Sequence, residues 1–176
     1  MYDKDEFIWK ITNCLDEFTS SELDLLIDNT REEAIAAALI PYLKKHFAEW
    51  SYNIDLNYDK MIINNRKVKK EVDFLLTSLP KSKVPKRFDL KHGYITKQVL
   101  PDLIFHDRNS NSHNFLVLEI KKSRNKNETE KNFDLIKLEI MTSTRLNYLY
   151  GAFVEFMTGP DYEEKEANYK LVLFNA

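Results

Sequence analysis

The feature that most constrains the fold is a short segment, residues 115–121, that is apolar on both of its faces until its last few positions. Side chains alternate along an extended strand, so the odd-numbered residues point one way and the even-numbered residues the other. A strand that is apolar on both sides is normally buried between two layers, as the inner strands of an α/β sheet are. We therefore expect this segment to form a buried strand.

The same segment ends with two charged side chains on one face, Glu119 and Lys121. Burying a charge is costly unless the charge has a partner, so each of the two needs one. A second apolar segment, residues 99–105, precedes a polar stretch at 108–114 that is typical of a turn. The two segments are expected to form a hairpin in which Asp102, on the first strand, can face Glu119.

This arrangement favours a divalent cation. Two carboxylates that meet at a buried strand end repel, and one of them takes up a proton unless a cation lies between them. Mg²⁺ prefers oxygen ligands and retains several waters, so Asp102, Glu119 and the backbone carbonyl of Ile120 would be sufficient protein ligands. Such an ion polarises a phosphate oxygen and acidifies a bound water, while Lys121 orients that water or offsets charge in the transition state. The expected reaction is phosphodiester hydrolysis, with Mn²⁺ as a substitute for Mg²⁺.

At these residues the sequence resembles the PD-(D/E)XK nuclease superfamily, whose signature is matched by Pro101-Asp102, a hairpin and Glu119-Ile120-Lys121. The resemblance extends to small uncharacterised bacterial and phage members through residues 101–108, 116–122, 134–138 and Tyr150-Gly151. It implies an α/β fold with a restriction-endonuclease-like αβββαβ core, in which a mixed central sheet is flanked by helices, here with extra N-terminal helices. In this family the acids bind Mg²⁺ and the lysine assists catalysis. The agreement ends at residues 55–60, where Asn57 stands in place of an acid.

The resemblance also implies that a glutamate from the first core helix often joins the metal site. Thr30 and Glu33 match a reciprocal capping box, which predicts a helix from residue 30 to about 47, with a kink or an early end near Ile40 as the alternative because Pro41 lacks a donor. The helical period places Glu32 on the presumed core side, whereas Glu33 is explained by the capping box. Glu32 is therefore the expected additional ligand, against the alternative that both acids only favour the N-terminal end of the helix dipole.

The rest of the chain predicts further elements around this hairpin. Apolar residues at three-and-four spacing indicate helices at 5–18 and 128–146, with a short helix ending at residue 27. Strands are expected at 50–58, 148–157 and 169–174. Residues 61–79 favour either a helix or an extended excursion. At 176 residues the chain is expected to form one domain, with a helical extension at 1–29 and the core at 30–176.

Charge is distributed unevenly along the chain. Residues 60–97 hold eleven Lys and Arg against three acids, a net charge of +8, whereas the whole chain carries −2. One basic face is therefore expected, for which phosphate contact and an ordinary solvated surface are competing explanations. The overall negative charge argues against indiscriminate nucleic-acid binding.

The sequence also favours a cytoplasmic location. Cys14 is the only cysteine, so no internal disulfide can form and a reducing compartment is expected. The first nine residues lack the basic and apolar blocks of a secretory signal, and the most apolar run, residues 34–43, is well short of the ~18 residues that a membrane span needs. Neither export nor membrane insertion is expected.

Several residues have a simpler explanation than a role in the site. His106 shares strand parity with Asp102 and is a further candidate for substrate contact, although a lone histidine near a strand end is more often structural. Asp134 and Lys137, one helical turn apart, are expected to form a surface pair. The aromatic residues of the 148–157 strand are expected to lie in the core rather than to stack on bases.

The leading hypothesis is a Mg²⁺-dependent nuclease, with Asp102, Glu119, Ile120 and Glu32 around the metal, Lys121 as the catalytic helper, and DNA as the expected substrate. The alternative is a catalytically inactive nuclease-fold module that binds nucleic acid or a protein partner. The sequence separates neither DNA from RNA nor endonuclease from exonuclease activity. It also leaves the oligomeric state open, with a homodimer as one option.

Overall fold

The computed structural model of the protein describes residues 3–63, 66–84, 93–110, 113–143, 146–164 and 167–175. In this part of the chain the helices are α1 (Lys4–Ser21), α2 (Leu23–Ile27), α3 (Glu32–His46), α4 (Glu128–Ser143) and α5 (Pro160–Glu164), with two 3₁₀ turns, η1 (Leu76–Ser78) and η2 (Lys81–Lys83). The strands are β1 (Asn53–Leu56), β2 (Lys60–Ile63), β3 (Arg66–Lys69), β4 (Glu71–Leu75), β5 (Tyr94–Gln98), β6 (Leu103–His106), β7 (Asn114–Lys122), β8 (Tyr150–Phe156) and β9 (Tyr169–Asn175). None of these helices combines the length and the apolar character that crossing a membrane requires.

A five-stranded mixed sheet forms the centre of the molecule, in the order β1-β6-β7-β8-β9. The pairs β1/β6, β6/β7 and β8/β9 are antiparallel, and β7 and β8 are parallel. Parallel strands need a crossover connection, which α4 supplies between β7 and β8. The strand that is apolar on both faces, β7, is the middle strand of the sheet, which agrees with its expected burial.

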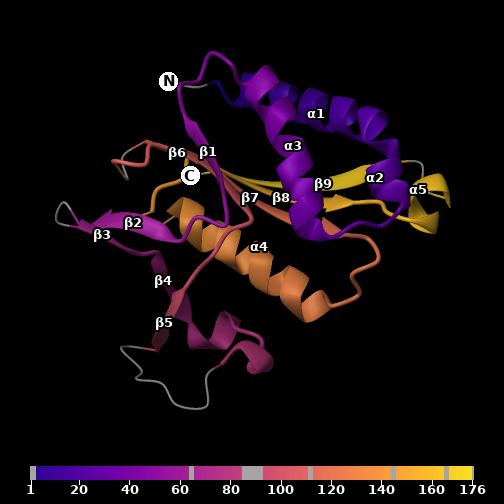
Figure 1. The fold of residues 1–176 in the computed structure, drawn as a ribbon. Coiled ribbons are helices and arrows are strands. Elements are labelled where there is room, and N and C mark those ends of the chain that lie inside the picture. The colour runs from indigo at the N-terminus through magenta and orange to yellow at the C-terminus, as the bar shows by residue number, and fades with distance from the viewer. Residues whose placement is uncertain are drawn as a thin grey trace.

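Helices cover both faces of this sheet (Figure 1). On one face α1 and α3 enclose a core that includes Phe7, Leu39 and Leu118. On the other face α4 packs against the sheet together with strands β2 to β5, in a second core that includes Phe74 and Met141. The expected α/β fold with a helix-flanked mixed sheet is confirmed.

The expected hairpin is also confirmed, with one irregularity. Phe105 pairs with Leu116 and His106 pairs with Asn114, so Phe115 is an extra residue in β7. A bulge of this kind interrupts the alternation of side chains between the two faces of the strand. Phe115 accordingly packs in the core under α1 and α3, although Val117 packs on the α4 side.

Between β1 and β6 the chain leaves the sheet as an insert, residues 57–101, which contains two antiparallel ribbons, β2/β3 and β4/β5. Figure 1 shows these ribbons extending beyond the central sheet. Asn57, at the start of the insert, has a positive φ of 48°, a conformation that asparagine tolerates better than most residues. Its N–H donates to the carbonyl of Asp102 at 3.1 Å, so the insert begins and ends at the same point.

One prediction about local structure is wrong. The helix α3 is not capped by Thr30, because the Thr30 hydroxyl donates to the carbonyl of Leu25 at 2.9 Å and the N-cap residue is Arg31, which makes no side-chain capping bond. The expected helix itself is confirmed, since α3 continues past Pro41 to His46, and only the alternative of an early end is wrong.

For residues 61–79 the helical alternative is wrong and the extended one is confirmed. Val72 and Phe74 are buried while Asp73 between them is exposed, which is the alternation of a half-buried strand. The strand β4 pairs with β5, and Phe74 stacks on Phe133 of α4 with ring centroids 5.3 Å apart. The basic stretch at 60–97 thus forms much of the insert, and the part of it at 85–92 lies outside the described residues.

Candidate active site

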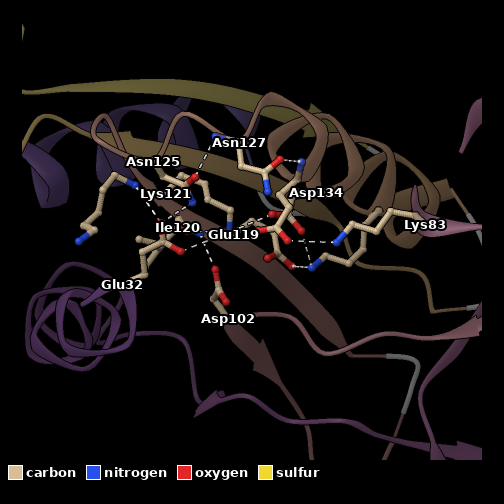
Figure 2. Close-up of polar contacts among 12 residues, drawn as sticks. Glu32, Lys83, Asp102, Glu119, Ile120, Lys121, Asn125, Asn127 and Asp134 are labelled. Carbon is tan, nitrogen blue, oxygen red and sulfur yellow. Dashed lines mark hydrogen bonds and ion pairs between the residues drawn. The ribbon is translucent and has the colours of Figure 1, made fainter. Parts of the chain in front are cut away.

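The hairpin brings Asp102 and Glu119 to the same end of the sheet. Asp102 directly precedes β6, and the pairing of Leu103 with Leu118 places it beside Glu119 on β7. The Asp102 carboxylate accepts a hydrogen bond from the N–H of Ile120 at 2.8 Å, which fixes it against β7. Figure 2 shows both acids with Lys121 in one cluster. The structure therefore brings together the acids and the lysine that the sequence singled out.

Glu119 is buried, with only 1% of its surface exposed. Burial raises the pKa of Glu119 well above its ordinary value, and the ammonium group of Lys137 opposes that rise. Burial also raises the pKa of Asp102, against the N–H of Ile120 and the charge of Lys121, which lower it. Both acids are thus held where their ionised forms need a nearby positive charge.

Lys121 is held by three oxygen atoms. Its Nζ lies 2.9 Å from Asp134 Oδ2, 3.6 Å from Glu32 Oε2 and 3.2 Å from the carbonyl of Ile120. Burial alone would lower the pKa of Lys121, but the carboxylates of Asp134 and Asp102 raise it above the ordinary value. Lys121 is therefore a fixed ammonium group at the site.

The prediction that Asp134 and Lys137 form a pair on the surface is wrong. The two residues are only 6% and 5% exposed, and both belong to the site. Asp134 Oδ1 lies 2.9 Å from Lys137 Nζ, which in turn lies 2.7 Å from Glu119 Oε1. The reason is that α4 crosses over the charged end of β7, which gives both side chains buried partners. A signal was present in the sequence, because Asp134 is spaced at four and seven residues from the buried Leu138 and Met141.

Of the two helix glutamates, the structure places Glu32 at the site and leaves Glu33 exposed. Besides its contact with Lys121, Glu32 accepts from the N–H of Lys122 at 3.3 Å and from Asn125 Nδ2 at 3.2 Å. Its observed partners are thus a lysine, an amide and a backbone N–H. In this geometry Glu32 connects α3 to the end of β7.

The structure does not bring His106 to this cluster. It lies at the other end of β6 from Asp102, four residues away, or about 13 Å along an extended strand. There its Nε2 is 2.9 Å from Asp55 Oδ2 and its ring contacts that of Tyr58 at 4.5 Å between centroids. Arg108 pairs with the same carboxylate of Asp55, so His106 belongs to a separate polar group.

The residues of the cluster fit a hard divalent cation, although no group of three or more His, Cys, Asp or Glu side chains in the described ranges is arranged to hold a metal. Asp102, Glu119 and the Ile120 carbonyl form a set of oxygen donors that waters would complete, as Mg²⁺ prefers. Within the described structure, Glu119 Oε1 lies 2.7 Å from Lys137 Nζ and has no other hydrogen-bond partner. In their ionised forms, the four carboxylates and two ammonium groups of the cluster leave two negative charges, which a divalent ion would neutralise.

Comparison of the chain with protein-family models, with curated proteins and with solved structures finds no match. A function for the protein therefore has to come from its own residues and their geometry.

Proposed function

We propose that the protein is a cytoplasmic, Mg²⁺-dependent nuclease that hydrolyses phosphodiester bonds of DNA. One observation carries the proposal: Asp102 and the buried Glu119 meet beside Lys121 at the end of the middle strand, in the Pro-Asp, hairpin, Glu-x-Lys order of the PD-(D/E)XK nucleases. The succession α3, β1, β6, β7, α4, β8 supports the same assignment, because it follows the αβββαβ order of the restriction-endonuclease-like core.

The residues around the site have separate tasks. Asp102, Glu119 and the carbonyl of Ile120 would hold the ion, which when bound polarises a phosphate oxygen and lowers the pKa of a water molecule. Lys121 stays protonated because of its carboxylate neighbours, and its ammonium group offsets negative charge that develops on the phosphate. Asp134 holds Lys121 from α4 and Glu32 holds it from α3.

The proposal is tested by incubating the purified protein with single- and double-stranded DNA, and with RNA, in the presence of Mg²⁺ or Mn²⁺. Lys121→Ala is expected to reduce cutting by at least about 100-fold, since a group that stabilises transition-state charge is lost. Circular dichroism checks that the variant is folded. Lys126→Ala is the matched control, because Lys126 follows the same strand but is 76% exposed and should leave cutting unchanged. Full activity in Lys121→Ala would reject the assignment.

The contact of Lys137 with Glu119 favours a second function, a non-enzymatic module of the same fold that binds nucleic acid or a protein. In such a module the lysines neutralise the acids and no metal is needed. Titration calorimetry with Mn²⁺ separates the two functions. The nuclease takes up the ion and loses that uptake in Asp102→Asn and in Glu119→Gln, whereas the module shows no uptake that depends on either acid.

A further inference from the structure

An open cavity of about 360 Å³ adjoins the candidate active site, with Glu32 at the boundary between them. Apart from Glu32 the cavity is lined by Asn29, Arg31, Glu33, Lys122, Arg124 and Asn125. None of the described residues of this lining has an aliphatic or aromatic side chain, so the cavity suits a polar ligand. The two oxygens of Glu32 point to different neighbours: one contacts Lys121, and the other contacts the N–H of Lys122 and the amide of Asn125.

The charges of the lining favour an anion. Arg31 and Arg124 are exposed, and neither forms an ion pair with another residue in the described part of the chain. Lys122 adds a third positive charge, and its Nζ donates to the carbonyl of Asn29 at 3.1 Å. Glu32, which contacts Lys121 and Asn125, and Glu33 are the opposing charges on the lining, so its three basic residues exceed its acids by one.

The dipole of helix α3 adds to the positive electrostatic potential at the cavity. It begins at the cavity and is 15 residues long, so the positive end of its dipole lies beside Arg31 and Glu33. Its N-cap residue, Arg31, makes no side-chain capping bond. A guanidinium group next to free backbone N–H groups is a common setting for phosphate oxygens, because its planar fork can donate to two of them.

We infer that this cavity binds a phosphodiester group of a nucleic-acid strand, next to the phosphate that is cut beside Lys121. This inference rests on the proposed nuclease function and gives its substrate a path over the N-terminus of α3 and the end of β7. Glu32 contacts both Lys121 and the cavity wall, so the two positions are neighbours, as successive phosphates of one strand are. The contact is to the backbone of the strand and does not depend on base sequence.

The test measures the affinity of the whole protein for a short fluorescent DNA oligonucleotide in EDTA, by anisotropy, at several KCl concentrations. The double variant Arg31→Ala with Arg124→Ala is expected to bind at least about tenfold more weakly at low salt, and its salt slope is expected to fall by about 1.4 to 1.8. Glu33→Gln removes the opposing charge and is expected to bind about two- to threefold more tightly.

A matched control is the double variant Lys4→Ala with Lys44→Ala, which removes the same charge from exposed positions at the start of α1 and near the far end of α3. Its affinity is expected to stay within about twofold of wild type at high salt, where long-range charge effects are screened. If the arginine variant binds DNA no more weakly than this control, the strand site is rejected.

The outcomes also separate this inference from the proposed function. A wild type that cuts DNA, with arginine variants that bind and cut normally, rejects the strand site and keeps the nuclease. Binding that depends on the two arginines, without any cutting, rejects the nuclease and keeps the strand site. Inorganic phosphate is tested alone: if it raises the melting temperature of wild type but not of the arginine variant, while DNA affinity is equal, the cavity takes free anions and the strand assignment is wrong.

Discussion

Asp134 and Lys121 form a buried ion pair, 2.9 Å between Oδ2 and Nζ, that joins α4 to the end of β7. The other oxygen of Asp134 lies equally close to Lys137, so one carboxylate serves two buried ammonium groups. We predict that Asp134→Asn lowers the free energy of unfolding by about 3 kcal/mol, because two buried ammonium groups each lose one of their two carboxylate partners. Urea denaturation followed by circular dichroism measures the loss.

The control for this prediction is Glu128→Gln on the same helix. Glu128 is 73% exposed and contacts Lys131 at 3.4 Å, so its loss should change stability by less than about 0.5 kcal/mol. Equal effects of the two substitutions would mean that the Asp134 pair is not a buried link between helix and sheet.

Glu119 gives the stability a dependence on pH. Burial raises its pKa well above 4.5, so the folded protein binds this proton more tightly than the unfolded chain does. The free energy of unfolding therefore falls as the pH rises from about 4.5 toward the raised pKa. We predict that Glu119→Gln removes this fall, which urea denaturation of both proteins between about pH 5 and pH 8 would reveal. Parallel curves for the two proteins would contradict the prediction.

Lys70 gives the stability a pH dependence of the opposite sign. It is buried on the insert, its Nζ donates to the Tyr148 hydroxyl at 2.9 Å and to the Tyr58 carbonyl at 3.1 Å, and burial lowers its pKa from 10.5 to about 7. Between these two values the unfolded chain holds a proton that the folded protein lacks, so stability rises with pH in this window. We predict that Lys70→Met abolishes the rise.

Urea denaturation midpoints measured near the two ends of that window test the prediction. The neighbouring Lys69, which is exposed, provides the control as Lys69→Met and should keep the wild-type rise. A rise that persists unchanged in Lys70→Met would assign it to another group.

Gly151 allows α4 to pack closely on the sheet. A Cβ at this position of β8 would lie 3.0 Å from Thr142 Cγ2 and 3.2 Å from Phe174 Cβ. We predict that Gly151→Val destabilises the protein by about 2 kcal/mol, because the larger side chain forces α4 away from β8. Since α4 also supplies Asp134 and Lys137, metal uptake measured by calorimetry should weaken as well. An unchanged melting temperature would show that the packing can yield.

The sheet centre and the pair of acids could be predicted because both depend on local sequence. Alternating apolar residues are enough to define β7, and a short polar turn is enough to define a hairpin that sets Asp102 beside Glu119. The roles of Asp134 and Lys137 could not be predicted in this way. A charged pair one turn apart is usually solvated, and only the placement of α4 over the end of β7 gives these two their buried partners.

Competition between alternative partners explains the other differences between the predicted and the observed structure. The sequence allowed the Thr30 hydroxyl to cap α3, but in the folded protein it donates to the carbonyl of Leu25 instead. The valines of residues 61–79 fit a helical spacing as well as a strand, and the choice is made by pairing with β5, some 20 residues further along the chain. Such choices depend on tertiary contacts that propensity does not contain.

The insert leaves and rejoins the molecule at a single point, the hydrogen bond between the Asn57 N–H and the Asp102 carbonyl. A segment closed at its base in this manner can change in length at a small cost in loop-closure entropy, provided that the buried contacts of Phe74 with Phe133 and of Lys70 with Tyr148 are kept. Its attachment point is Asp102, one of the two clustered acids. The hydrogen bond that closes the insert thus also fixes the backbone at Asp102, so changes in the insert that keep this bond should leave the carboxylate geometry the same.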